Sequence, residues 1–288
     1  SDACKYLFET YIPASFQTTN PMHVTGFDVQ LTLSYSSRKL TNDLNAYLTS
    51  NKLNARFPDH VHYQTFLDSL TRLITTRLRS KLLQEGLTKI RQAQKDNRDS
   101  SYWSVVIDNL ISLNNYSVLN RDKSMSDNLK FLVNKKYKEE KIIVWAANGH
   151  IMKRLDQINV KAQYRKPFQY VIFNNMGTHF TNDPALSEKT YILGFTSYKG
   201  TAGRLGGNTF SVGVPNKNGL ENWIPKDISY AFLDFKGYNK KFGNPEKPFL
   251  MKAPEHHTIP GKVAKIPWNL IYDGIFFIRE MYPVQFVK

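Results

Sequence analysis

The hydrophobic pattern of the chain changes near residue 141, and this change limits the folds available to it. Before it, Leu67, Leu70 and Ile74 recur at spacings of three and four residues, as on one face of an amphipathic helix. After it, residues 142–146 form a run of β-branched and aromatic side chains, typical of a strand covered on both faces. Helices first and strands later predict an α/β fold. We expect a layered domain with a central, mostly parallel sheet covered by helices and a helical section in the first half.

The chain reads as two sections of one domain, a mainly helical section over residues 1–135 and a strand-rich section over 136–288. In the first section the spacing predicts one helix over 67–82 that extends past Gly86, and a second over 103–113. A third begins near Asp122, with Asp122 or Ser124 as its N-cap. Besides residues 142–146, the second section offers five further strands: 170–173, 191–195, 210–214, 230–235 and 274–278.

Composition excludes several classes of protein. A chain of 288 residues with 41% hydrophobic content can bury a sizeable core, and no apolar run approaches the length of a membrane span. The single cysteine, Cys4, excludes an intrachain disulfide and a Cys-based metal site. The net charge of +15 invites a nucleic-acid partner, but the Lys and Arg residues are dispersed and match no nucleic-acid-binding motif. We therefore predict a small-molecule ligand and no nucleic acid.

The most promising residues for chemistry follow the predicted strand at 142–146. Asn148 and His150 lie where the chain leaves that strand, and ligands of layered α/β proteins meet the carboxyl ends of strands. A His at this place could act as a general base or polarise a carbonyl, because its pKa lies near neutrality. The alternative is a loop His bonded to backbone, with Asn148-Gly149 merely making a turn. The residues alone favour this alternative.

Two motifs in order make the chain resemble the erythromycin esterase-like family. Arg121 to Asn128 is similar to the family's Arg-Asp-x-x-Met-x-x-Asn at the head of a helix. Trp145 to His150 is similar to its Trp-Ala-His-Asn-x-His after a strand. Weaker likenesses extend the resemblance from about Gly26 to Pro283. They are Gly26 to Gln30, for the family's Gly-x-Asp-x-Gln, then Met176-Gly177, 191–195 and 272–278.

The resemblance implies hydrolysis of an ester by water that His and carboxylate groups activate, without metal or cofactor. It makes His150 the catalytic residue, which contacts substrate or the oxyanion. Substrate-binding roles fall to Asn148, which orients a neighbour, to Asp28, and to Arg121 with Asp122, which form a charged wall of the cleft. Each of these four residues also has a purely structural interpretation. Asn148 could be a turn residue, Asp28 a strand-end residue, and Arg121 with Asp122 an ion pair at the start of a helix.

The chain departs from the family pattern in two ways. Ala147 stands where the family has the first His of its paired-His motif. The family's early Gly-Glu-x-x-His-Gly segment, whose His is taken to activate water, has no match here, since Glu255-His256-His257 lies in a Pro-rich stretch near the other end. We therefore expect a chain processed or cut from something longer, and either an incomplete hydrolase domain or a family member that binds a small molecule without turning it over.

Other groupings are weaker. The glycines between 200 and 207 lack the Gly-Lys-Ser/Thr that completes a phosphate loop, and there is no Gly-x-Ser-x-Gly elbow. His60 and His62 lack an evident third ligand for a metal, and their Pro-Asp surroundings indicate a loop.

Overall fold

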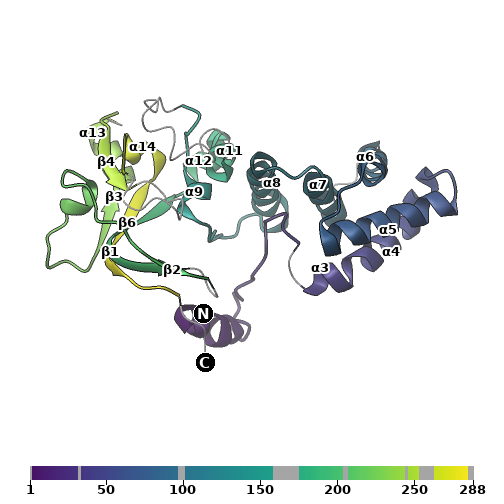
Figure 1. Cartoon of the computed structure of the whole chain (residues 1–288), viewed down its shortest axis with the longest axis horizontal. Helices are drawn as coiled ribbons and strands as arrows, with labels where there is room; N and C mark the ends of the chain where they lie inside the picture. The colour runs from purple at the N-terminus through teal and green to yellow at the C-terminus, as the bar shows by residue number, and fades with distance from the viewer. Residues whose placement is uncertain are drawn as a thin grey trace. The chain divides into compact units, whose positions relative to one another are not determined.

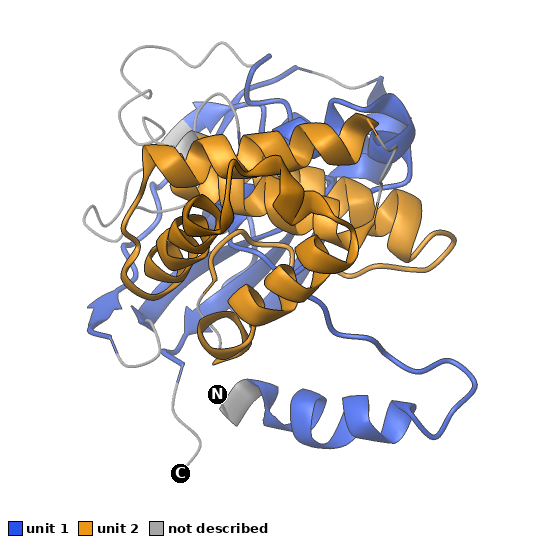
Figure 2. Cartoon of the chain, turned by 90° about the vertical axis from the view of Figure 1, so that its right-hand side faces the viewer, with its two compact units in different colours: residues 1–26, 144–288 blue, residues 27–143 orange. Residues whose placement is uncertain are grey.

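A computed structural model describes residues 2–31, 34–96, 101–157, 175–203, 207–243, 246–252 and 263–284. The chain divides into two compact units, residues 27–143 and residues 1–26 with 144–288, which Figure 2 colours orange and blue. We call them the helical unit and the sheet unit. Figure 1 labels many of their helices and strands.

The helical unit packs leucine-rich helices around one core. Leu44, Phe66, Leu87 and Ile107 are fully buried in this core, and each comes from a different helix. The elements are α3 (Ser34–Arg38), α4 (Leu40–Ser50), η2 (Leu53–Arg56), α5 (His60–Thr76), α6 (Lys81–Asp96), α7 (Tyr102–Asn114), α8 (Val118–Phe131) and η3 (Leu132–Lys136).

The single helix expected over 67–82 is wrong, because the chain breaks between α5 and α6. Asp59 caps α5, its side chain accepting from the backbone N–H of His62, so His60 and His62 lie on a helix rather than in a loop. Arg77 ends α5 with φ of 60°, a left-handed conformation that stops a helix. The leucine spacing continues on both sides of this break, which is why the pattern alone reads as one helix.

The helix expected near Asp122 begins earlier. Ser117 is the N-cap of α8 and accepts from the backbone N–H of Asn120. Asp122 and Ser124 are therefore interior residues rather than caps, and Asp122 is buried. The helix predicted over 103–113 is confirmed as α7.

The sheet unit is built around a four-stranded sheet in the order β2-β1-β6-β3, with a separate antiparallel pair of β4 and β5. The strands are β1 (Leu193–Gly203), β2 (Thr209–Ser211), β3 (Tyr230–Asp234), β4 (Phe249–Lys252), β5 (Val263–Ile266) and β6 (Gly274–Met281). The helices are α1 (Asp2–Lys5), η1 (Tyr6–Tyr11), α2 (Ile12–Ser15), α9 (Asn148–Ile151), α11 (Met176–Thr181), α12 (Pro184–Glu188), η4 (Leu220–Asn222), α13 (Phe235–Phe242) and α14 (Trp268–Ile271).

The α/β class with a helical first half is confirmed, while the sheet is mixed rather than mostly parallel. Among the described strands of this sheet, β1 and β6 pair in parallel, with Leu193 opposite Gly274. The pairs β1–β2 and β3–β6 are antiparallel. The sequence predicted the strands at 210–214, 230–235 and 274–278 to within three residues, whereas the strand predicted at 191–195 continues to Gly203. Strand content does not fix strand direction. The strand predicted at 170–173 lies outside the described residues.

The strand predicted at 142–146 is wrong. This segment has no regular secondary structure and joins no ladder with the other described residues, and Ile143 and Trp145 are 90% and 73% exposed. An apolar run predicts a strand only where a neighbouring backbone is free to pair with it, and the run itself does not carry that information.

The two faces of the main sheet differ. Ile275 and Phe277 on β6 are fully buried in the described part of the unit, and Trp268 and Tyr272 stack beside them at 6.1 Å between ring centroids. The opposite face presents Phe195, Tyr230 and Phe232, each more than half exposed. Among the described residues, the apolar core of the sheet unit therefore lies against one face of the main sheet.

Candidate active site

The short helix α9 carries Asn148 and His150. Ala147 precedes it with extended backbone and accepts the first bond of the turn, from the N–H of His150 at 2.9 Å. Asn148 pairs with β1 as a strand residue would: its Nδ2 donates to the carbonyl of Phe195 at 2.6 Å, and its Oδ1 accepts from the N–H of Phe195 at 3.0 Å. This amide therefore fixes the start of the turn to the edge of β1.

The helix α11 holds the turn from a second direction. Asn175 is 1% exposed and caps α11, its Oδ1 accepting from Thr178 N–H at 3.0 Å, while its Nδ2 donates to the carbonyl of Gly149 at 2.9 Å. A Cβ on Gly177 would overlap the carbonyl groups of Ile151 and Met152. Only glycine lets the two backbones approach so closely.

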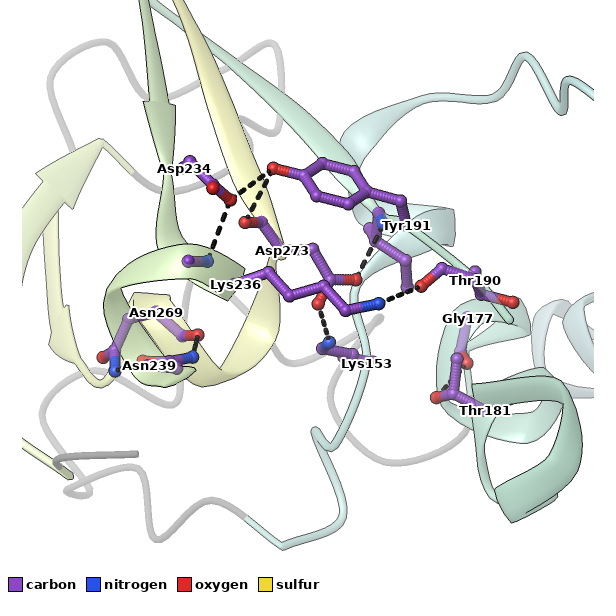
Figure 3. A network of polar contacts seen from close by, with 12 residues as sticks. Lys153, Gly177, Thr181, Thr190, Tyr191, Asp234, Lys236, Asn239, Asn269 and Asp273 are labelled. Carbon is purple, nitrogen blue, oxygen red and sulfur yellow. Dashed lines mark hydrogen bonds and ion pairs between the residues drawn. The ribbon is translucent and has the colours of Figure 1, made fainter. Parts of the chain in front are cut away.

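A buried ion pair fixes the chain just after the turn (Figure 3). Lys153 Nζ lies 2.6 Å from Asp273 Oδ1, and the side chains are 14% and 8% exposed. Asp273 Oδ2 accepts from the N–H of Ile192, and Lys153 N–H donates to the carbonyl of Ile271. The segment that bears His150 is thus attached to the residues around the starts of β1 and β6.

The network in Figure 3 continues to the start of α13. Tyr191 donates its hydroxyl to Asp234 at 2.9 Å, and burial together with this bond raises the pKa of Tyr191. Asp234 caps α13 by accepting from Gly237 N–H, and that bond lowers the pKa of the Asp234 carboxyl. These groups stabilise the frame around the turn.

In the helical unit, two residues of the Arg121 to Asn128 motif hold the segment that contains Asp28. Arg121 binds Asp28 with two nitrogens, at 3.1 and 2.6 Å, and the bond to Asp28 raises the pKa of Arg121. Asn128 donates to the carbonyl of Phe27 at 2.8 Å. Seven residues separate Arg121 from Asn128, so both lie on one face of α8. Two short motifs that lie 93 residues apart in sequence are thereby brought into contact.

A polar cavity of about 350 Å³ lies between α7 and α8 in the same unit. Its lining includes Asp108, Asn109 and Asn128, and Asp108 is paired with Arg91 at 2.7 Å. None of the five residues predicted for the site lines this cavity.

The five predicted residues thus form two groups, one in each unit. Asp28 and Arg121 are in direct contact in the helical unit, and Asp122 is buried beside them in α8. Asn148 and His150 share one turn of the sheet unit; the His150 ring is partly buried, with its Nδ1 enclosed. Sequence reasoning missed Asn175 and Lys153, whose side chains hold this turn.

A family model described as erythromycin esterase matches residues 15–280. The chain belongs to the erythromycin esterase family. Two solved structures share its fold. A Bacillus cereus protein, 17% identical, has a TM-score of 0.62 over 93% of this chain and 68% of its own. A succinoglycan biosynthesis protein, 14% identical, has a TM-score of 0.63 over 97% of this chain and 69% of its own. No curated protein sequence matches the chain.

The described part of this erythromycin esterase family member contains neither a cluster of metal ligands nor a membrane-spanning helix. Among its described residues, no three His, Cys, Asp or Glu side chains come together as metal ligands would. Within the same residues, none of the helices has the length and apolar character needed to cross a membrane.

Proposed function

We propose that this chain is a hydrolase domain that acts on a small-molecule ester through water activated by His and carboxylate groups. His150 contacts the substrate or the oxyanion that develops during hydrolysis. The proposal needs no metal or cofactor. It rests on the family membership and on one structural observation, the fixed turn that carries His150.

That turn is held in place before any ligand arrives. Asn148, the first residue of the turn, binds β1, and Asn175 binds the carbonyl in the middle of the turn. Lys153 fixes the chain that follows through its ion pair with Asp273. Catalytic groups contribute most when their geometry is set in advance, because no energy is then spent on ordering them during the reaction. A loop His with only a packing role has no need of such attachments.

The remaining predicted residues receive different roles in this proposal. Both atoms of the Asn148 amide are bonded to Phe195, so we assign Asn148 the task of orienting its neighbour His150. Asp28 binds Arg121 in a two-pronged pair, and we assign this pair and Asp122 a substrate-binding role within the helical unit.

The names of the relatives support a proposal for the substrate class. The family takes its name from the hydrolysis of erythromycin, a macrolide, and one structural neighbour is named for the synthesis of succinoglycan, a polysaccharide. We therefore propose an ester of a macrolide-like compound or of an acylated carbohydrate as the substrate.

Binding without turnover is the second candidate function. Ala147 supports it, because an imidazole at this position in the family pattern is absent here. Turnover and binding separate the two candidates: a hydrolase consumes the ester, whereas a binding protein retains it unchanged.

The experiment compares the turnover of the 288-residue chain with that of an extended version, which carries at its N-terminus the residues encoded before Ser1. Both are assayed on a panel of simple esters and macrolides. Activity confined to the extended version supports the hydrolase proposal and a base supplied from upstream, since general-base assistance is worth about a hundredfold to ten-thousandfold. Equal turnover by both versions contradicts the upstream base. Macrolide binding with no turnover by either version supports the second candidate.

Ala147→His tests the role of the missing imidazole. If the extended version is inactive, this substitution is expected to restore some rate, because it returns a hydrogen-bond donor beside His150. A folded variant with no gain in rate counts against placing position 147 in the site.

A further inference from the structure

The side chain of Asn175 makes two contacts with different functions. Its Oδ1 accepts from Thr178 N–H and so caps α11. Its Nδ2 donates to the carbonyl of Gly149, the residue between Asn148 and His150. The first contact stabilises a helix, whereas the second fixes the turn that carries the imidazole.

Burial makes the second contact specific. Asn175 is 1% exposed and Gly177 has no room for a Cβ, so α11 lies directly against the backbone of Ile151 and Met152. The bond between Asn175 and the Gly149 carbonyl is part-buried, so losing the Asn175 donor removes a hydrogen bond that solvent replaces only in part. The turn would then relax, and the imidazole one residue later would move with it.

We propose that Asn175 is a positioning residue that sets the orientation of the His150 imidazole. The proposal rests on the proposed function of His150 for its catalytic meaning, while its structural content can be measured without a substrate. Asn175 itself touches neither the imidazole nor a substrate in this proposal; it acts through the carbonyl of Gly149.

Two variants separate the contacts of Asn175. Asn175→Ser keeps a preferred N-cap oxygen for α11 but is too short to reach Gly149. Asn175→Asp keeps the size and the capping oxygen but, when ionised, cannot donate. Asp183→Ala is the matched control, because Asp183 caps the neighbouring helix α12 through Ala185 and Leu186 and makes no described contact with the turn.

The measurement is the carbon–proton spectrum of the histidine rings at pH 8, with the His150 signal assigned by its loss in His150→Gln. Asn175→Ser and Asn175→Asp are expected to shift or broaden the His150 signal, while Asp183→Ala leaves it in place. If either Asn175 variant folds and keeps the wild-type His150 signal, the proposal is overturned. If neither variant folds, hydrogen exchange in the wild type measures the peptide unit that joins Gly149 to His150. Exchange of the His150 amide as rapid as that of exposed loops refutes a fixed turn, and strong protection of this amide supports it.

If the extended version is active, its kinetics provide a second test of the proposal. Asn175→Ser should lower kcat by about tenfold to a hundredfold with KM nearly unchanged, as expected for a misplaced catalytic group. An unchanged kcat beside a moved ring signal refutes the catalytic meaning of the placement. If His150→Ala keeps full activity, the proposed function fails, whereas the ring signal still decides whether Asn175 orients His150.

Discussion

Different interactions stabilise the helical unit and the sheet unit internally. In the helical unit, fully buried apolar side chains recur along four helices and form a single continuous core. Among the described residues of the sheet unit, apolar packing covers one face of the main sheet, while Phe195, Tyr230 and Phe232 are exposed on the other. Individual residues such as Asn148, Asn175 and Asp273 supply specific contacts there. Apolar volume stabilises the first unit, and single polar or backbone contacts decide the geometry of the second.

The sharpest test of this comparison truncates one phenylalanine in each unit. Phe66 is 0% exposed in the helical core, whereas Phe232 is 56% exposed on β3. We expect Phe66→Ala to lower the free energy of unfolding by about 3–5 kcal/mol. Phe232→Ala should change it by about 0.5 kcal/mol or less. Denaturant unfolding of both variants measures the difference, and equal losses would show that the exposed face of the sheet is covered in solution.

A second test probes backbone packing in the sheet unit. A Cβ on Gly177 would meet the carbonyls of Ile151 and Met152, so Gly177→Ala is expected to cost about 1–3 kcal/mol of stability. Gly26→Ala is the matched control, because nothing lies within 4 Å of its added Cβ. Thermal unfolding compares the two. Equal melting temperatures would mean that α9 and α11 are not in close contact.

The pH dependence of the sheet unit provides a smaller effect. Bonds from Gly237 N–H and the Tyr191 hydroxyl lower the pKa of Asp234 below its ordinary value of 3.8. Its charged form therefore contributes stability that is fully present above that value and is lost as pH falls through the lower pKa of the folded state. Asp234→Asn keeps a capping oxygen without the charge, and Asp234→Ala loses both, at a cost of about 1 kcal/mol at neutral pH.

Unfolding at pH 7 and at pH 3 checks this dependence. The wild type should lose part of its advantage over Asp234→Asn at the lower pH. A stability difference that is the same at both values would exclude a contribution from the Asp234 charge.

The helical unit was the more predictable of the two from sequence. The spacing of Leu67, Leu70 and Ile74 sets a helix face through a local rule, and a helix does form there. The break at Arg77 was missed because a left-handed residue can be non-glycine and leaves no mark in the apolar pattern. Local periodicity therefore predicted the elements but not their ends.

The sheet unit was less predictable because its decisive contacts join distant residues. The run at 142–146 has every local property of a strand, yet it pairs with none of the described strands, while the strand directions depend on connections that the run does not encode. The partners of the candidate site behave likewise. Asn175 and Asp273 are ordinary polar residues in sequence, and only the fold brings them to the segment around His150.

The most direct test of the central claim is His150→Ala, with melting temperature and ligand handling measured on the same samples. A His fixed in place for function should leave the melting temperature nearly unchanged while abolishing macrolide binding, or turnover in the extended version. The opposite result, unchanged binding and turnover with about 1–3 kcal/mol of lost stability, would make His150 a packing residue and contradict the account.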